Sequence, residues 1–141
     1  MKELTWTADE TGMVSGSYTH DGTLSKLILV NSGQLDLEIK CVSGKSVLAR
    51  LSGITYLNVK ELWESSILLG FFVCKISDIP DGEYKSGFWH SLFVGRESDS
   101  NMERTAHEIK KKTPDSLLVE VECSYGGSIA VVCASLCFFE V

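Results

Sequence analysis

Apolar and polar residues alternate most regularly between residues 35 and 41, where leucine, isoleucine and cysteine are separated by aspartate, glutamate and lysine. Successive side chains on a β-strand point to opposite faces, so this pattern predicts a strand with one buried face and one charged face. Short apolar runs precede it at residues 24–30 and follow it at residues 47–51, and turn residues separate all three. The segment therefore predicts an antiparallel meander.

Strands are also predicted in the rest of the chain. Residues 67–76 contain few polar side chains, which is typical of a central strand covered on both faces. Residues 117–123 alternate again, with Glu120 and Glu122 between apolar neighbours. Shorter runs that predict strands lie at residues 4–8, 13–19, 54–59, 129–134 and 136–141.

One amphipathic helix is predicted over residues 100–112. Ser100 and Glu103 have the spacing of a capping box, an apolar side chain recurs every three or four residues, and Pro114 ends the helix. A chain of 141 residues is the size of one ordinary domain. The expected fold is a single, mainly β domain over residues 1–141, an antiparallel sandwich or strongly bent sheet of about seven to nine strands with this helix.

Aromatic residues gather in the segment 84–94, whose pattern fits either a short helix or a strand. If Tyr84, Phe88 and Trp89 were exposed together, they would form a cleft for a small molecule or a carbohydrate. Further upstream, Trp63 is predicted to pack in the core, whereas an exposed tryptophan there would indicate a contact surface.

Charge and cysteine content narrow the function classes. The formal net charge is −6, which argues against a nucleic-acid surface, and the basic run 110–112 is interpreted as cations at the end of a helix. The apolar runs are too short to span a membrane. Five cysteines lie in apolar segments and residues 1–10 do not resemble a secretory signal, so a cytoplasmic protein with free thiols is expected.

Catalytic and metal-binding patterns are weak. Cys133 and Cys137 lack the spacing of a zinc site, so neither a metal nor a cofactor is expected. His20 and Asp21 precede a glycine and are interpreted as turn residues, and no nucleophile motif surrounds His90. The sequence therefore predicts a protein that is not an enzyme.

Two short motifs carry a resemblance to a known group of proteins. The His-Asp-Gly turn at 20–22 leads into the meander 24–51, and the Ser-Tyr-Gly-Gly-Ser turn at 124–128 leads into the run 129–133. Together they resemble small bacterial β-rich proteins of the polymorphic-toxin immunity kind. The resemblance implies a cytoplasmic protein that binds and blocks one toxin domain.

Four acidic residues are candidates for contacting such a partner. Asp36, Glu38, Glu120 and Glu122 occupy positions predicted to point outward from strands. An acidic surface would attract a basic nuclease toxin, although the same charges also serve ordinary solubility. The expected function is therefore a non-enzymatic binding protein, with the small-molecule or carbohydrate binding domain as the alternative.

Overall fold

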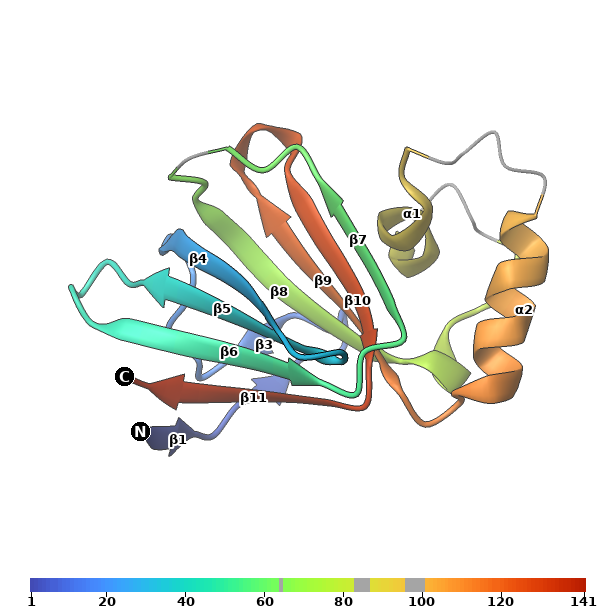
Figure 1. Cartoon of the computed structure of the whole chain (residues 1–141), viewed down its shortest axis with the longest axis horizontal. Coiled ribbons are helices and arrows are strands. Elements are labelled where there is room, and N and C mark those ends of the chain that lie inside the picture. Colours follow the sequence, from blue (N-terminus) through green and yellow to red (C-terminus); the bar gives the residue numbers. More distant parts are fainter. Residues whose placement is uncertain (64, 83–86, 96–100) are drawn as a thin grey trace.

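A computed structural model describes residues 1–63, 65–82, 87–95 and 101–141 of the chain. Its main body is two antiparallel sheets that face each other (Figure 1). The five-stranded sheet has the order β1 (Lys2–Leu4), β11 (Ser135–Glu140), β6 (Ser46–Ser52), β5 (Gln34–Lys40) and β4 (Thr23–Val30). The four-stranded sheet has the order β7 (Tyr56–Lys60), β10 (Ser128–Cys133), β9 (Leu117–Cys123) and β8 (Leu68–Lys75).

The main core lies between the two sheets. Leu35 and Leu37 of β5 face Val119 and Val121 of β9 across it, and all four side chains are fully buried. Their charged neighbours along each strand point to the outer faces, as the period of two requires. Burial of these apolar side chains is the dominant stabilising contribution to such a fold.

The chain passes between the sheets twice at one corner. The β6–β7 connection contains Gly53 at φ +67°, and a Cβ atom there would lie 2.7 Å from the Cβ of Ala134 in the β10–β11 connection. The amide of Ala134 donates a hydrogen bond of 2.8 Å to the carbonyl of Ser52. Glycine is required at this crossing because only it combines the positive φ with so close an approach.

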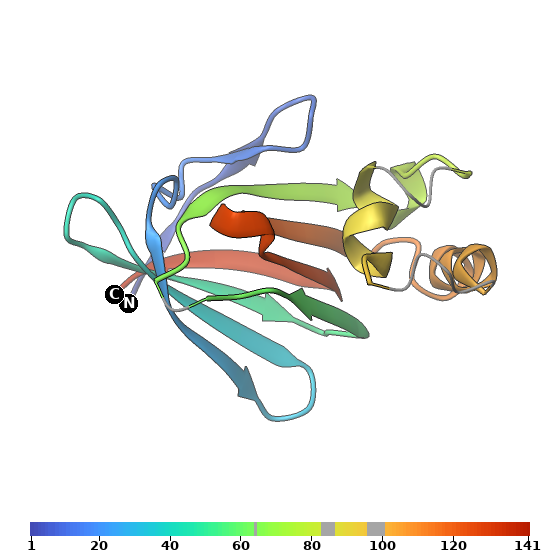
Figure 2. The same ribbon diagram turned by 90° about the horizontal axis from the view of Figure 1, so that it is seen from above.

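A helical layer covers one end of the outer face of the four-stranded sheet (Figure 2). It consists of α1 (Gly87–Phe93), α2 (Met102–Lys112) and the 3₁₀ turn η1 (Ile76–Asp78). Trp89 of α1 is buried in a second core with Leu118 and Val132 of the sheet. Asn58 of β7 fixes α1 by donating hydrogen bonds of 2.9 Å and 3.0 Å to two carbonyls at its C-terminal end. The sheet is therefore buried on both faces only where the helices lie.

A small hairpin completes the described part of the chain. Strands β2 (Thr7–Ala8) and β3 (Val14–Ser15) pair with each other, and Met13 forms an isolated bridge with Phe72 at the edge of β8. No described helix is long and apolar enough to cross a membrane.

The structure confirms a mainly β fold built from antiparallel sheets, and the sheets are not closed into a barrel. The predicted helix is present as α2, with Asn101 at its N-cap, while Ser100 lies outside the described residues. The prediction of a single helix is incomplete, because residues 87–93 of the aromatic segment form α1.

The prediction for Trp63 is wrong. Its side chain is 66% exposed, and no helical turn is present in the described residues between β7 and β8. Instead Ser66 Oγ donates to the Trp63 carbonyl at 2.7 Å and accepts from the Trp63 amide at 3.1 Å. These hydrogen bonds pair the backbone groups of Trp63 within the connection itself. The connection is therefore held in place without packing of the indole against the core.

Candidate binding site

The two predicted acidic residues on the five-stranded sheet, Asp36 and Glu38, are paired with cations. Asp36 of β5 lies opposite Arg50 of β6, and its two carboxylate oxygens accept hydrogen bonds of 3.0 Å from Nε and 2.9 Å from Nη2. This pair leaves Asp36 only 7% exposed, which corrects the expectation of an exposed acidic side chain there. Glu38 forms an ion pair of 3.3 Å with Lys26 of β4.

Glu120 and Glu122 lie on the opposite side of the molecule. Both point outward from β9 on the four-stranded sheet, where Glu120 is half-buried and Glu122 is exposed. Within the described residues, neither carboxylate forms an ion pair or accepts a hydrogen bond. The four predicted acidic residues therefore do not form one surface, and only these two remain available to a partner.

A cavity of about 350 Å³ lies on this outer face, between α1 and the turn that joins β9 to β10. We refer to it as the outer-face cavity; its lining includes Lys60, Leu69, His90, Glu120, Glu122 and Tyr125. Register explains the hollow, because Ser128 of β10 lies between Lys60 on one side and Glu122 on the other, and its side chain is small. Since α1 covers only the far end of the sheet, the cavity remains open.

The electrostatics of the outer-face cavity are unusual. Burial, together with repulsion from Glu122, raises the pKa of Glu120 to about 7. His90 Nδ1 is buried and has no hydrogen-bond partner among the described residues. A buried nitrogen without a partner is costly, and such groups are uncommon in folded proteins. Two carboxylates, one of them with a raised pKa, therefore line this cavity.

Four large exposed side chains lie at the end of the four-stranded sheet away from the helices, and two of them, Leu69 and Tyr125, line the cavity. We call this set the aromatic edge: Trp63, Ile67, Leu69 and Tyr125. Tyr125 is 85% exposed and has a left-handed backbone with φ of +60°. Two hydrogen bonds tie its turn to the residue just before β8, one from the Ser124 amide to the Ile67 carbonyl and one from the Ile67 amide to Ser124 Oγ. These bonds fix the backbone from which the exposed ring projects.

The predicted aromatic cleft is not formed by Trp89. Its indole is 1% exposed in the second core, and its Nε1 donates a hydrogen bond of 3.3 Å to the Pro80 carbonyl. Phe88 is half-buried, and Tyr84 lies outside the described residues. The expectation of an exposed cleft around Trp89 fails because α1 turns this residue toward the sheet, where it fills the space above Leu118.

The histidines do not come together as a catalytic group. His20 Nδ1 lies 3.1 Å from Asp21 Oδ2, and both side chains are exposed in a turn where Asp21 has φ of +60°. His20 lines a different cavity from His90. No group of three metal-binding side chains occurs in the part of the chain that the structure describes.

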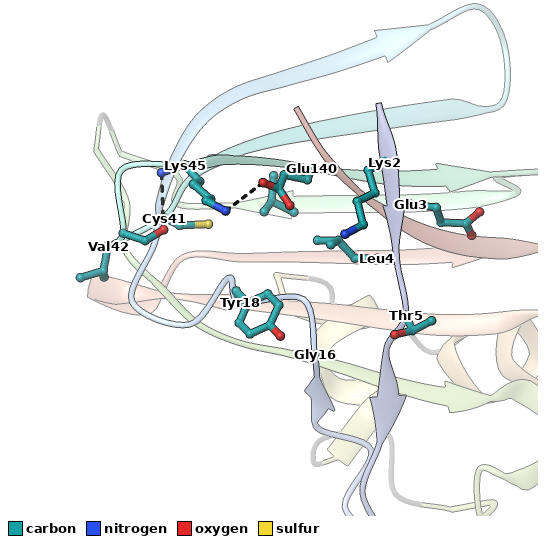
Figure 3. A pocket seen from close by; sticks show the side chains of 12 residues that line it. Lys2, Glu3, Leu4, Thr5, Gly16, Tyr18, Cys41, Val42, Lys45 and Glu140 are labelled. Atoms are coloured by element: carbon teal, nitrogen blue, oxygen red, sulfur yellow. Dashed lines mark hydrogen bonds and ion pairs between the residues drawn. The ribbon is translucent and has the colours of Figure 1, made fainter.

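A larger cavity, of about 740 Å³, lies beside the edge strand β1 (Figure 3). Tyr18, Cys41 and Leu4 line it, and the ion pair of 3.0 Å between Lys45 and Glu140 closes one side. Burial raises the pKa of the Cys41 thiol, which therefore stays protonated and unreactive at neutral pH. We call this space the terminal cavity.

The aromatic edge was missed by the sequence patterns. Tyr125 was interpreted only as part of a glycine turn, although a large aromatic side chain in such a turn has few core positions open to it. For Trp63 the core was the favoured prediction, and the structure shows the alternative, an exposed side chain that indicates a contact surface. The useful signal is therefore an aromatic residue within a connection rather than within a strand.

Comparison with models of protein families, with curated proteins and with solved structures found no match to this chain. The functional argument therefore starts from the geometry of the outer face of the four-stranded sheet.

Proposed function

We propose that this is a non-enzymatic binding protein whose ligand is another protein, of the kind that inhibits a bacterial toxin domain. The observation that carries the proposal is the aromatic edge, of which Leu69 and Tyr125 line the same cavity as two carboxylates that form no ion pair among the described residues. A cytoplasmic location accompanies this proposal, because all five cysteines are free thiols and most are buried.

The composition of the aromatic edge suits a protein partner. Tryptophan and tyrosine are enriched in protein interfaces and supply much of their binding free energy. Trp63 and Tyr125 project from connections whose backbones are held by hydrogen bonds to Ser66 and Ser124. Little backbone order has to be created when a partner binds, which lowers the entropic cost of association.

Charge indicates which partner this surface fits. Glu120 and Glu122 adjoin the aromatic edge, and the whole chain carries a formal charge of −6. A protein with a basic surface would be steered toward this face, since charge complementarity raises association rates. The acids on the five-stranded sheet contribute less, because Arg50 and Lys26 neutralise them locally.

The proposal is tested with three tagged proteins: the wild type, a Trp63→Ser/Tyr125→Ser variant, and an Ile28→Ser/Leu29→Ser variant. The last pair is exposed on edge strand β4 and serves as the matched control. Each is used to capture proteins from a lysate of the source cells, and the captured protein is then purified and titrated calorimetrically. We expect one stoichiometric basic protein whose affinity falls at least about 100-fold with the first variant and is unchanged with the second.

Toxin inhibition is tested by co-expression of the captured protein. The wild type and the β4 variant should restore growth of cells that produce the partner, and the variant of the aromatic edge should not. Equal affinity of all three proteins for the partner would contradict the proposed surface. A partner whose expression is harmless would contradict the inhibitor function.

Small-molecule binding remains a second candidate, at a different place from the predicted aromatic cleft. It is favoured by the terminal cavity, whose volume of about 740 Å³ lies in the usual range for ligand sites. Tyr18 on its rim is 75% exposed and provides a ring for stacking. A ligand screen by thermal shift, repeated with Tyr18→Ala, tests this function: stabilisation that the variant loses would support it, and no stabilised condition would contradict it.

A further inference from the structure

We propose that the terminal cavity binds a small aromatic carboxylate, whose ring stacks on Tyr18 and whose negative charge is held by Lys2. This assignment rests on the second candidate function, small-molecule binding, and it adds the chemical class of the ligand.

The backbone at Tyr18 is held in a conformation that its side chain disfavours. Its φ is +58°, which is rare and strained for a bulky residue. The side chain is 75% exposed, so burial of the ring does not offset this strain. Strain of this kind gathers at functional sites, where the surrounding structure holds a residue in place. The exposed ring therefore has a role other than packing.

The segment around Tyr18 is fixed on both sides of the ring. Ser17 and Thr19 are buried, and their hydroxyl oxygens lie 3.0 Å apart in a hydrogen bond. Gly16 has φ of +88°, and a Cβ atom there would lie 2.7 Å from the carbonyl oxygen of Thr5. A ring that is already fixed at the rim of a cavity loses little entropy when a ligand stacks on it.

The charges that face the terminal cavity favour a ligand with one negative charge. Lys2 and Leu4 of β1 are directed toward the cavity, whereas Glu3 is directed away from it (Figure 3). Strand register places Lys2 opposite Glu140, whose carboxylate lies 3.0 Å from Lys45 Nζ. Lys2 itself forms no ion pair within the described ranges. Two ammonium groups thus share one carboxylate, and the remaining positive charge matches a carboxylate better than a phosphate dianion.

The rest of the lining suits the apolar body of such a ligand. Leu4 and Val47 line the cavity together with Cys41, whose thiol is neutral because burial raises its pKa. Apolar walls with a few placed polar groups are typical of small-molecule sites, and a volume of about 740 Å³ admits a ring with a short chain. An aromatic ring is favoured over an aliphatic one because it can stack on the ring of Tyr18.

Binding is tested by NMR titration of the ¹⁵N-labelled full chain with 3-phenylpropionate. The neutral 3-phenylpropionamide is the control for charge, and propionate is the control for the ring. We expect shifts at residues 2–4, 16–18 and 41–47, with a dissociation constant on the order of 1 mM. The amide should bind about fivefold more weakly than 3-phenylpropionate, and propionate about tenfold more weakly.

Substitutions at the two proposed contacts test each of them separately. Lys2→Gln should weaken binding of 3-phenylpropionate about fivefold. Lys112→Gln removes an equal charge at the end of α2, on the opposite side of the molecule (Figure 1), and should leave binding unchanged.

Tyr18→Gly should lower the affinity about tenfold, and Tyr18→Phe should restore most of that loss because it keeps the ring. Tyr18→Gly should also raise the midpoint of thermal unfolding by about 3 °C, because glycine adopts a positive φ without strain. A residue whose ring stabilised the fold would shift this midpoint downward instead.

Four results would overturn the proposal: equal binding of carboxylate and amide, shifts confined to another surface, unchanged binding by Tyr18→Gly, or a lower unfolding midpoint for that variant. Failure of the ligand class is distinguishable from failure of small-molecule binding itself. Neutral compounds that stabilise the protein in the thermal-shift screen, and lose this effect with Tyr18→Ala, would keep the function and remove the carboxylate. The absence of both NMR shifts and stabilised conditions would contradict the function as well.

Discussion

The outer faces of the two sheets use their acidic residues differently. On the five-stranded sheet, each acid of β5 lies opposite a cation on a neighbouring strand: Asp36 opposite Arg50, and Glu38 opposite Lys26. Both pairs form ion contacts, at 2.9 Å and 3.3 Å. Both acids of β5 are therefore neutralised by cations of the same sheet.

On the four-stranded sheet, the residues opposite the acids of β9 carry no charge. Glu120 lies opposite Ala130, and Glu122 lies opposite Ser128. The two acidic strands look alike in sequence, and the difference comes from the strand beside each of them. Acids without a cross-strand cation keep their charge available, and this is why the proposed binding surface lies on the four-stranded sheet.

The largest change in the free energy of unfolding is expected from breaking the ion pair between Asp36 and Arg50. Asp36→Ala leaves the Arg50 guanidinium without its two acceptors in a partly buried setting. We expect a loss of about 2–3 kcal/mol in the free energy of unfolding, somewhat below that of a fully buried pair because Arg50 reaches solvent. Urea denaturation at pH 7 measures the loss. A change below about 0.5 kcal/mol would show that the pair is not a structural element.

Replacing Glu120 is expected to increase the free energy of unfolding instead of lowering it. The folded protein holds the Glu120 proton more tightly than the unfolded chain, because burial raises the pKa from 4.5 to about 7. Between these pH values the folded state binds more protons, so stability falls as pH rises through this window. Above pH 7 the cost of the buried charge is constant. Glu120→Gln removes that cost, and it should raise the free energy of unfolding by up to about 2 kcal/mol, allowing for solvent screening.

The pH dependence provides the control for this variant. Below about pH 4.5 Glu120 is protonated in both folded and unfolded wild type, so the two proteins should then be equally stable. Urea denaturation of both proteins at pH 4, 5.5 and 8 checks the sign. A Glu120→Gln protein that is less stable than wild type at pH 8 would mean that the carboxylate has a stabilising partner.

The smallest effect is expected at Glu38. Lys26, its partner, is 60% exposed, so solvent screens the ion pair. Glu38→Gln should therefore change the free energy of unfolding by less than about 0.5 kcal/mol, and added salt should reduce the difference further. Thermal unfolding at low and high salt measures it. A loss as large as that of Asp36→Ala would erase the distinction between the two pairs.

Local sequence patterns predicted the individual strands well, but they did not predict which residues lie opposite each other on neighbouring strands. The alternation in residues 35–41 correctly identified β5, because a period of two is a property of one strand. The pairing of Asp36 with Arg50 depends on the register of two strands, which periodicity does not reveal. The segment 84–94 was ambiguous because α1 has only seven residues, too few to show a helical period.

The candidate site was only partly predictable for the same reason. Glu120 and Glu122 were identified as outward-facing from alternation within one strand. The cavity beside them depends on two further features. Helix α1, which is distant in sequence, must approach β9, and the strand register must place the small side chain of Ser128 beside Glu122. Trp63 was misassigned because hydrophobicity alone does not show whether a connection needs a core contact.

The placement of strands β10 and β11 in different sheets has a consequence for biosynthesis. Strand β10 lies between β7 and β9, while β11 lies between β6 and β1, so residues 128–140 complete both sheets at once (Figure 1). Until these residues leave the ribosome, both sheets have open edges that invite wrong pairing with other chains. Loss of these two strands would therefore unfold the whole domain rather than fray one edge. Folding should be slow because so many contacts join distant parts of the chain.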